Sequence, residues 1–451
     1  MTPRTLTTTA LAALLALGLG ACSSPSSDTT ATSANPATTA TTAPSDFDKA
    51  MATPTTLTFW TWVNDIQNQI DLFTAKYPAI KVEVVNAGQG GPEYQKLRTA
   101  IEAGSGAPDV AQIEYQYLSS FRLTNDLLDL KPYVGDITGE FPGWIASQIG
   151  GNGGIWGVPQ DTGPMGFLYR TDLLQAAGLK TPATWAEFGT AATAYHTATG
   201  NYLTDMPGND PGQLVGLFWQ AGARPFAYDG DKTVTIDLTS DKVNQVLEFW
   251  QPLVDNGAVA TDPDFTDQWY QGLANGTYAS WLTAAWGPLF LQGTAGDTSG
   301  KWGAAPLPQW QTGAPVSGNW GGSTDAVLAS SPNPVAAAEL ARFINLEKAP
   351  ALTLANEQFL FPAMTSILGA PEFADATSDF YGGQKVNALF ATISGTVSTD
   401  FEWLPFMDYV YSSFNDTLGK AWADKTDLKA GAAAWQADLV QYAQAQGFTV
   451  K

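Results

Sequence analysis

Apolar and polar positions alternate along this chain with two periods, one typical of strands and one typical of helices. In 80–85 (IKVEVV), apolar residues occupy every second position, which predicts a strand. In 66–77, Ile66, Ile70 and Phe73 fall on one face of a helix. The first part of the body therefore predicts strands at 57–61, 80–85 and 110–113 and helices at 66–77 and 93–103.

Two later helices have clear N-terminal signals. Thr184 and Glu187 have the spacing of a capping box, and Asp210 precedes Pro211 at the first position of another helix. Alternating strands and helices predict an α/β fold with largely parallel sheets. The body has about 400 residues. A single hydrophobic core rarely supports a chain of that length, so we expect two lobes.

The N-terminal segment has the layout of a lipoprotein leader. Arg4 precedes an apolar run at 6–19, and LGAC at 19–22 resembles a bacterial lipobox. The thiolate of Cys22, the only cysteine, would accept the diacylglyceryl group. The apolar run is shorter than the ~20 residues that span a bilayer. We therefore predict a signal peptide at 1–21 and attachment through lipid on Cys22 alone.

A segment rich in Ser, Thr, Ala and Pro follows the predicted lipid anchor. It extends from 22 to 54 and predicts a flexible tether that holds a globular body away from the membrane. No later stretch is apolar enough to predict a transmembrane helix. The predicted location is the extracytoplasmic face of the bacterial cell membrane.

Charge and composition exclude several classes of partner and cofactor. The chain has 43 acidic and 21 basic residues, a net charge of −22, which argues against nucleic acid or anionic lipid. With Cys22 lipidated no disulfide can form. His196 is the only histidine, so we predict no metal centre and no cofactor. His196 lies in a predicted helix, where a packed or solvated role is expected.

Three further patterns favour structural roles. The glycine-rich stretches 88–91 and 150–154 lack the Lys-Ser/Thr of a phosphate-binding loop and predict turns. The acidic stretch 262–267 lacks the glycine and terminal glutamate of an EF-hand loop. A structural calcium ion at this stretch stays an open alternative.

Six segments follow one another in a distinctive order. The most specific is 153–188, with Gly-Val-Pro, then Tyr-x-x-Asp-Leu, then Thr-Trp-x-Glu-Phe. The others are LTFWTW at 57–62, FTAKYPAIKVEVV at 73–85, YQKLRTAIEAGSGAPDVAQIE at 94–114, KWGAAPLPQW at 301–310 and SGNWGGSTDAVLA at 317–329. In this order the segments resemble extracellular solute-binding protein family 1, the maltose-binding-protein-like lipoproteins of ABC importers, and the resemblance extends from Leu57 to the C-terminus.

The resemblance implies two α/β lobes joined by a hinge, with a ligand cleft between them. Hinge closure would capture a carbohydrate, and the closed protein would deliver it to ABC-transporter permease subunits. We expect a monomeric binding protein and no enzyme. The implied crossings lie near 159–163, 308–313 and 361–365, and the implied lobes are 55–160 with 311–360 (N-lobe) and 161–310 with 361–451 (C-lobe).

The aromatic content favours a carbohydrate ligand independently. The chain has 16 Trp, 15 Tyr and 22 Phe but is only 14% charged. Aromatic rings match the apolar faces of a pyranose, while carboxylates and amides bind its hydroxyls. Most aromatics pack cores, so only those at strand ends or in cleft loops are ligand candidates. Their number favours a di- or oligosaccharide.

Candidate ligand-binding residues follow the predicted strands of the first lobe and its first crossing. Trp62 and Asn64 follow the first strand, and Glu114 and Tyr115 follow the strand at 110–113. Asp161 lies in the first crossing, where it would bind sugar hydroxyls or brace the hinge.

The second half of the chain supplies the remaining candidates. Trp286 matches the family's stacking tryptophan, with Trp281 as a competitor. Trp320 is followed by Gly321 and Gly322, which would let a sugar approach both ring and backbone. Trp403 begins a late helix, and Asp210 caps a helix or contacts the ligand.

Two other functions stay open. The same fold could bind a non-sugar solute such as a polyamine, a metal complex or a peptide, and the acidity would suit a cation. An extracellular glycoside hydrolase would need two carboxylates ~5 Å or ~6.5–9.5 Å apart across the scissile bond. No such pair stands out in the sequence.

Overall fold

A computed structural model of the protein describes residues 45–451. The predicted signal peptide and Cys22 lie outside this range. Within it, the first helix is α1 (Asp46–Ala52), which begins with a capping box between Ser45 and Asp48 and buries Met51. The prediction that the tether extends to 54 is therefore wrong for 46–52, because this segment has a helix cap and an apolar residue that packs on the body.

One seven-stranded sheet passes through the molecule in the order β10-β6-β11-β3-β1-β2, and β9 also pairs with β6. Its strands are β1 (Thr55–Trp60), β2 (Ile80–Val85), β3 (Val110–Glu114), β6 (Val158–Arg170), β9 (Ser280–Ala284), β10 (Trp302–Pro306) and β11 (Asn319–Val327).

The sheet is mixed. Strand β1 is parallel to β2 and β3, as predicted, whereas β11 is antiparallel to both β3 and β6. Strand β6 is also antiparallel to β9 and β10. The prediction of largely parallel sheets is therefore wrong for this sheet beyond β3, because the chain returns along β11 and enters the sheet from its opposite end.

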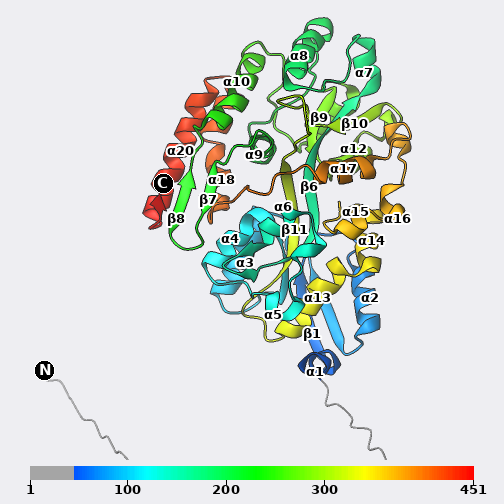
Figure 1. The fold of residues 1–451 in the computed structure, drawn as a ribbon, viewed down its shortest axis with the longest axis vertical. Coiled ribbons are helices and arrows are strands. Elements are labelled where there is room, and N and C mark those ends of the chain that lie inside the picture. The colour runs from blue at the N-terminus through cyan, green and yellow to red at the C-terminus, as the bar shows by residue number, and fades with distance from the viewer. Residues whose placement is uncertain (1–44) are drawn as a thin grey trace, which may run out of the picture. The chain divides into compact units, whose positions relative to one another are not determined.

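Two groups of elements surround this sheet and are called here the first and second lobe (Figure 1). The first lobe contains β1–β3 with α2 (Gln67–Lys76), α3 (Gly91–Glu102), α4 (Tyr115–Leu123), α5 (Lys131–Val134), α6 (Gly143–Ile149), α13 (Pro334–Leu346) and α14 (Lys348–Asn356). The second lobe contains β9 and β10 with α7 (Thr171–Ala176), α8 (Trp185–Thr199), α9 (Pro211–Gln220), α10 (Asp241–Asp255), α11 (Asp267–Asn275), α12 (Gly287–Thr294), α17 (Val386–Ser394), α18 (Met407–Phe414), α19 (Leu418–Ala423), α20 (Leu428–Ala445) and the hairpin of β7 (Phe226–Tyr228) and β8 (Thr233–Ile236).

Short elements complete the chain. They are β4 (Gly150–Gly151), β5 (Gly154–Ile155), β12 (Thr449–Val450), α15 (Thr365–Leu368), α16 (Pro371–Ala374) and the 3-10 turns η1 (Thr138–Glu140), η2 (Gly296–Thr298) and η3 (Asp379–Tyr381). No helix among residues 45–451 is both long enough and apolar enough to cross a membrane.

The two lobes share the long strand β6 and its partner β11. The first half of β6 pairs with β11, and residues 165–170 pair with β9 and β10. A third crossing lies beside them, where the Thr162 N–H donates to the Phe361 carbonyl at 2.9 Å. The crossing expected near 308–313 is absent there. That segment is held in the second lobe, where Gln309 bridges to Thr184 before α8, and the chain returns along β11 instead.

Local signals in the sequence correspond to the observed helix starts. The Thr184 hydroxyl accepts a hydrogen bond from the Glu187 N–H at 3.2 Å, which completes the predicted capping box of α8. Asp210 caps α9 through the Gly212 N–H at 2.7 Å, with Pro211 at the first helical position. His196 packs on Tyr202 with its ring centroid 5.2 Å away, so its role is the expected packed one.

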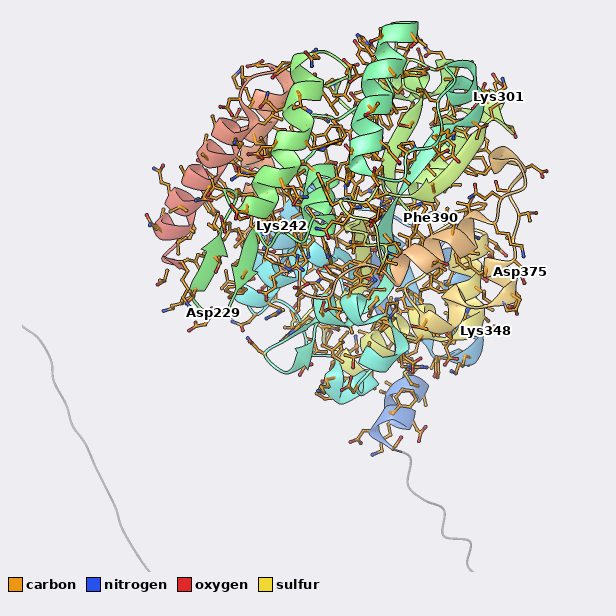
Figure 2. The ribbon with its side chains drawn as sticks, turned by 45° about the horizontal axis from the view of Figure 1, so that its top comes forward. Asp229, Lys242, Lys301, Lys348, Asp375 and Phe390 are labelled. Atoms are coloured by element: carbon orange, nitrogen blue, oxygen red, sulfur yellow. The ribbon has the colours of Figure 1, made fainter. Side chains whose placement is uncertain are left out.

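Most tryptophans pack the cores of the two lobes. Those that are almost fully buried are Trp144, Trp185, Trp219, Trp250, Trp269, Trp281, Trp302, Trp422 and Trp435. Packing is also tight beside the shared strand, where Phe390 of α17 lies against Gly166 of β6 (Figure 2). A Cβ at Gly166 would lie 2.8 Å from that ring, so the strand and α17 approach too closely for a larger residue. The abundance of tryptophan thus serves mainly the core.

Candidate functional site: a cleft between the lobes

A cleft of about 770 Å³ lies between the two lobes. The first lobe contributes the start of α3 and the end of β3 with the first turn of α4. The second lobe contributes the loops before α9 and α11 and one face of α18, and β11 lies between the two sides. The lining residues used below are Arg98, Glu114, Gln116, Tyr117, Asn209, Asp210, Asp264, Phe265, Trp320, Gly321, Asp408 and Tyr411.

One wall of the cleft is aromatic. Trp320 is 7% exposed, and its ring meets that of Trp286 edge-on with centroids 4.9 Å apart. The Trp286 Nε1–H donates to the Trp320 carbonyl at 3.0 Å, so Trp286 fixes Trp320 from behind. Phe265 lies 5.9 Å from Trp320 and leaves 40% of its surface exposed. The rings of Trp320 and Phe265 therefore give the cleft an apolar surface, with Trp286 supporting it from behind.

The backbone of β11 bulges next to Trp320. Gly321 and Gly322 have φ values of +75° and +93°, and the pairing with β6 shifts register between Asn319 and Gly322. Gly321 lines the cleft, whereas Gly322 is buried behind it. A Cβ on Gly322 would lie 2.8 Å from the Tyr115 ring, so glycine is required there for both conformation and space.

Carboxylates from both lobes also line the cleft. Glu114 accepts hydrogen bonds from the Tyr94 hydroxyl at 3.2 Å and from the Gln116 amide at 3.1 Å. Burial raises the pKa of Glu114 to about 7, although these hydrogen bonds oppose the shift. Burial also raises the pKa of Asp210, which caps α9. From the sequence, Asp210 was expected either to cap a helix or to contact the ligand. In the structure it caps α9 and also lines the cleft.

Asp264 is the most buried acid of the cleft, with 3% of its surface exposed. Its Oδ1 accepts a hydrogen bond from the Asn209 amide at 2.9 Å, while its Oδ2 has no partner among the described residues. Burial raises its pKa to about 7, and the nearby Asp210 adds to the shift. The cleft therefore presents hydrogen-bond acceptors next to an aromatic surface.

Two contacts join the lobes across the cleft. Arg98 of α3 forms an ion pair with Asp408 of α18, with 3.0 Å between Nη2 and Oδ2. The rings of Tyr117 and Tyr411 meet edge-on with centroids 6.2 Å apart. The cleft is thus enclosed by side chains from both lobes.

Asp161 lies behind the cleft, in the hinge. Its Oδ1 accepts hydrogen bonds from the Ser323 N–H at 2.9 Å and from the Ser323 hydroxyl, which ties β6 to β11. Gln112 of β3 donates to Ser323 at 2.9 Å and extends this network into the first lobe. Burial raises the pKa of Asp161 to about 6. The geometry is that of the hinge-bracing alternative.

The remaining candidates lie elsewhere. Tyr115 is buried and donates through its hydroxyl to the Asp161 carbonyl at 3.1 Å. Trp62 is half-buried at the end of β1 and Asn64 is exposed beyond it, and neither lines the cleft. Trp403 lines a separate cavity of about 370 Å³, which Tyr115 also borders, and its Nε1–H donates to Gln148 at 2.5 Å.

The structure thus brings Glu114, Trp320 and Gly321 together in the cleft, with Trp286 behind them. Sequence reasoning missed Arg98, Asp408 and Tyr411 because nothing local marks them. The acidic stretch at 262–267 did mark Asp264, but as a possible calcium ligand. Among residues 45–451, no group of three or more Asp, Glu, His or Cys side chains could hold a metal ion.

Known proteins that are similar to this chain are described as solute-binding or sugar-binding proteins. Residues 58–349 match the family model described as "Bacterial extracellular solute-binding protein". The lactose-binding protein of Rhizobium radiobacter is 28% identical over 74% of this chain and 81% of its own length. The arabinooligosaccharide-binding protein of Bacillus subtilis (strain 168) is 24% identical over 64% of this chain and 69% of its own length.

Solved structures agree with these matches. The ABC transporter associated binding protein from B. animalis subsp. lactis Bl-04, in complex with β-1,6-galactobiose, is 34% identical with a TM-score of 0.77, over 88% of this chain and 99% of that chain. The galacto-N-biose-/lacto-N-biose I-binding protein from Bifidobacterium longum, in complex with lacto-N-biose, has the same TM-score at 24% identity, over 88% and 98%. The predicted two-lobed α/β fold is confirmed.

Proposed function

Because the chain belongs to the family of bacterial extracellular solute-binding proteins, we propose that its cleft binds a short oligosaccharide and that the protein delivers it to an ABC importer. The observation that carries this proposal is the pairing of an aromatic wall with buried acceptors. Trp320 and Phe265 provide apolar surface, and Glu114 and Asp264 provide carboxylate oxygens within the same cleft.

A pyranose needs both kinds of surface. Its C–H faces pack on aromatic rings, and its hydroxyls donate to carboxylates and amides. A cleft of about 770 Å³ is within the ~300–1,000 Å³ typical of small-molecule sites. This volume suits a ligand of disaccharide size. The contacts across the cleft, such as Tyr117 with Tyr411, would enclose it.

The ligands named for the relatives narrow the choice of sugars to test first. Lactose and β-1,6-galactobiose both contain a β-linked galactosyl unit, whereas the less similar Bacillus subtilis relative is named for arabino-oligosaccharides. The protein bound to β-1,6-galactobiose is 34% identical to this chain over most of both lengths. We therefore propose a β-galactoside disaccharide as the first ligand to test.

The charge of the cleft bears on the alternative solutes. Glu114, Asp210 and Asp264 line it, and Arg98 is already paired with Asp408. This excess of acids disfavours anionic ligands through like-charge repulsion. It would suit a cation, so a polyamine is the competing ligand. The aromatic wall next to hydroxyl acceptors favours the neutral sugar.

The test is a thermal-shift and calorimetric panel on residues 45–451. The ligands are β-1,6-galactobiose, lactose, lacto-N-biose, an arabino-oligosaccharide, maltose and spermidine. A ligand at 100 times its Kd adds about 2.7 kcal/mol of apparent stability. We expect a β-galactoside to stabilise the protein and W320A to abolish the response. The control W310A removes a half-buried tryptophan that packs on Trp185 outside the cleft and should keep binding. A response to spermidine alone would refute the proposal that the ligand is a sugar.

We also propose that Cys22 carries the lipid anchor, that the lobes rotate about β6, β11 and the segment at 361–362, and that the protein acts as a monomer on permease subunits. The hinge proposal is supported by the Asp161–Ser323 network. Mass spectrometry of the protein from its native membrane would detect a diacylglyceryl group on Cys22. A diacylglyceryl group on an N-terminal Cys22 supports the anchor, and an unmodified Cys22 in the membrane-derived protein overturns it.

A further inference from the structure

We infer that Asp264 determines specificity in the cleft: its free Oδ2 accepts a hydrogen bond from one hydroxyl of the bound sugar. The inference rests on the proposed function, because it names the residue that selects among hydroxylated ligands. It is carried by the geometry of one loop, residues 262–267, which precedes α11.

Asn209 holds both the side chain and the backbone of Asp264. The Asn209 amide donates to Asp264 Oδ1 at 2.9 Å, and the backbone N–H of Asp264 donates to Asn209 Oδ1 at 3.1 Å. Both residues line the cleft. With Oδ1 engaged, the carboxylate cannot turn without losing a hydrogen bond, so the position of Oδ2 is fixed in advance of ligand binding.

Oδ2 is buried and has no hydrogen-bond partner among the described residues. Such an acceptor costs free energy unless something donates to it. The neighbouring acids differ in this respect. Asp205 accepts from the Asp262 N–H at 2.8 Å and from the Trp269 indole at 3.1 Å, and Asp262 accepts from the Tyr278 hydroxyl. These two acids hold the loop together, which leaves Asp264 with the capacity for a ligand.

The next residue places an apolar surface beside this oxygen. Phe265 has a φ of +57°, which a non-glycine residue rarely adopts, and its ring is 40% exposed. Its centroid lies 5.9 Å from that of Trp320. Strained residues of this kind persist where the surrounding structure holds them, often at binding sites. Asp264 and Phe265 together offer an acceptor for the edge of a pyranose and a ring for its face.

This arrangement selects for a hydroxyl. A site with a buried acceptor rejects an analogue that lacks the donor, because the acceptor then stays unpaired. The nearby Asp210 adds negative charge, so an anionic substituent at the same place would be repelled. The ligand class is therefore a neutral sugar with a free hydroxyl at one defined position, and the corresponding deoxy sugar should bind weakly.

The experiment measures Kd by calorimetry for the tightest-binding sugar of the panel and for each of its monodeoxy analogues. D264N replaces the free acceptor by a donor and removes the charge, and D264A removes the whole group. D267N, an exposed acid of α11 outside the cleft, is the matched control. At a pH above 7, where Asp264 is ionised, we expect both Asp264 variants to weaken binding by roughly 10- to 150-fold, the range for hydrogen bonds to charged groups. D267N should bind as the wild type does.

The deoxy series separates a direct contact from a structural effect. One monodeoxy analogue should lose affinity with the wild type but lose little more with D264A, because the same hydrogen bond cannot be removed twice. Unchanged affinity in D264N and D264A, with sugar binding intact in the wild type, overturns this inference and leaves the proposed function standing. Absence of sugar binding by the wild type overturns both.

A structure decides the case if neither Asp264 variant folds. In a crystal of the wild type with its sugar, a ligand hydroxyl within hydrogen-bond distance of Asp264 Oδ2 supports the inference. A water, a protein donor or an apolar ligand group at that position overturns it.

Discussion

The ion pair between Arg98 and Asp408 joins α3 of the first lobe to α18 of the second, so its loss should weaken ligand binding by destabilising the closed arrangement. The two side chains are 29% and 41% exposed, with 3.0 Å between Nη2 and Oδ2. The first lobe already orients the arginine. Its Nη2 donates to the Ser120 hydroxyl at 2.8 Å, and its guanidinium lies 4.2 Å from the Phe121 ring centroid.

The expected magnitude follows from this geometry. An exposed ion pair contributes about 0.2–1 kcal/mol, in part because ordering long side chains costs entropy. Arg98 is ordered before it meets Asp408, so the upper half of that range applies, about 0.5–1 kcal/mol. The pair exists only when the lobes are in contact, and its whole contribution therefore favours the closed state. Ligand affinity should fall by about 2- to 5-fold in D408N.

The assay is calorimetry on the wild type, R98A, D408N and the double variant, with the sugar that binds best. The cycle should give a coupling of about 0.5–1 kcal/mol at low salt. It should shrink at high ionic strength, where exposed charges are screened. The control is E372Q, which breaks the Lys348–Glu372 pair, also 3.0 Å long, between α14 and α16 away from the cleft (Figure 2 labels Lys348).

Two results would refute the reasoning. If D408N binds as tightly as the wild type, the pair does not favour closure. If R98A and D408N each weaken binding strongly and their effects add, the two side chains contact the ligand separately and do not act as a pair. A loss in E372Q equal to that in D408N would show that removing any surface charge has the same effect.

The sequence predicts the parts of the fold that depend on near neighbours. The alternation in 80–85 gives β2 with the predicted bounds, and Thr184 with Glu187 gives the start of α8. These signals are local because strand period and helix caps involve residues within a few positions of each other. The same reasoning places Glu114 at the carboxyl end of β3, at the edge where ligands meet an α/β sheet.

The sequence does not predict which distant segments meet. Strand β11 joins the sheet between β3 and β6 in antiparallel orientation, which no local pattern specifies. Asp161 illustrates the consequence for the site. Its position after Val-Pro in the first crossing was compatible with either a ligand contact or a hinge-bracing hydrogen bond. The carboxylate is held in the hinge by Ser323, which is 162 positions away in the sequence. Asp264 needs Asn209 in the same way.

Two further predictions concern the hinge and the buried acids near it. G322A should lower the free energy of unfolding by about 2–5 kcal/mol in urea melts, because alanine meets both a left-handed φ and a crowded site. G383A, with a φ of +83° and nothing within 4 Å of a Cβ, should lower the free energy of unfolding by only about 1–2 kcal/mol. Equal losses in G322A and G383A would show that the crowding around Gly322 does not affect stability. Burial raises the pKa of Asp325, whose Oδ1 has no partner among the described residues, from 3.8 to about 7. The folded protein therefore favours protonated Asp325. The free energy of unfolding that this protonation contributes is fully present below about pH 4 and is lost as the pH rises through about 7. Between those values the free energy of unfolding should decline less in D325N than in the wild type or D267N, and parallel profiles for all three would show that Asp325 does not stay protonated in the folded protein.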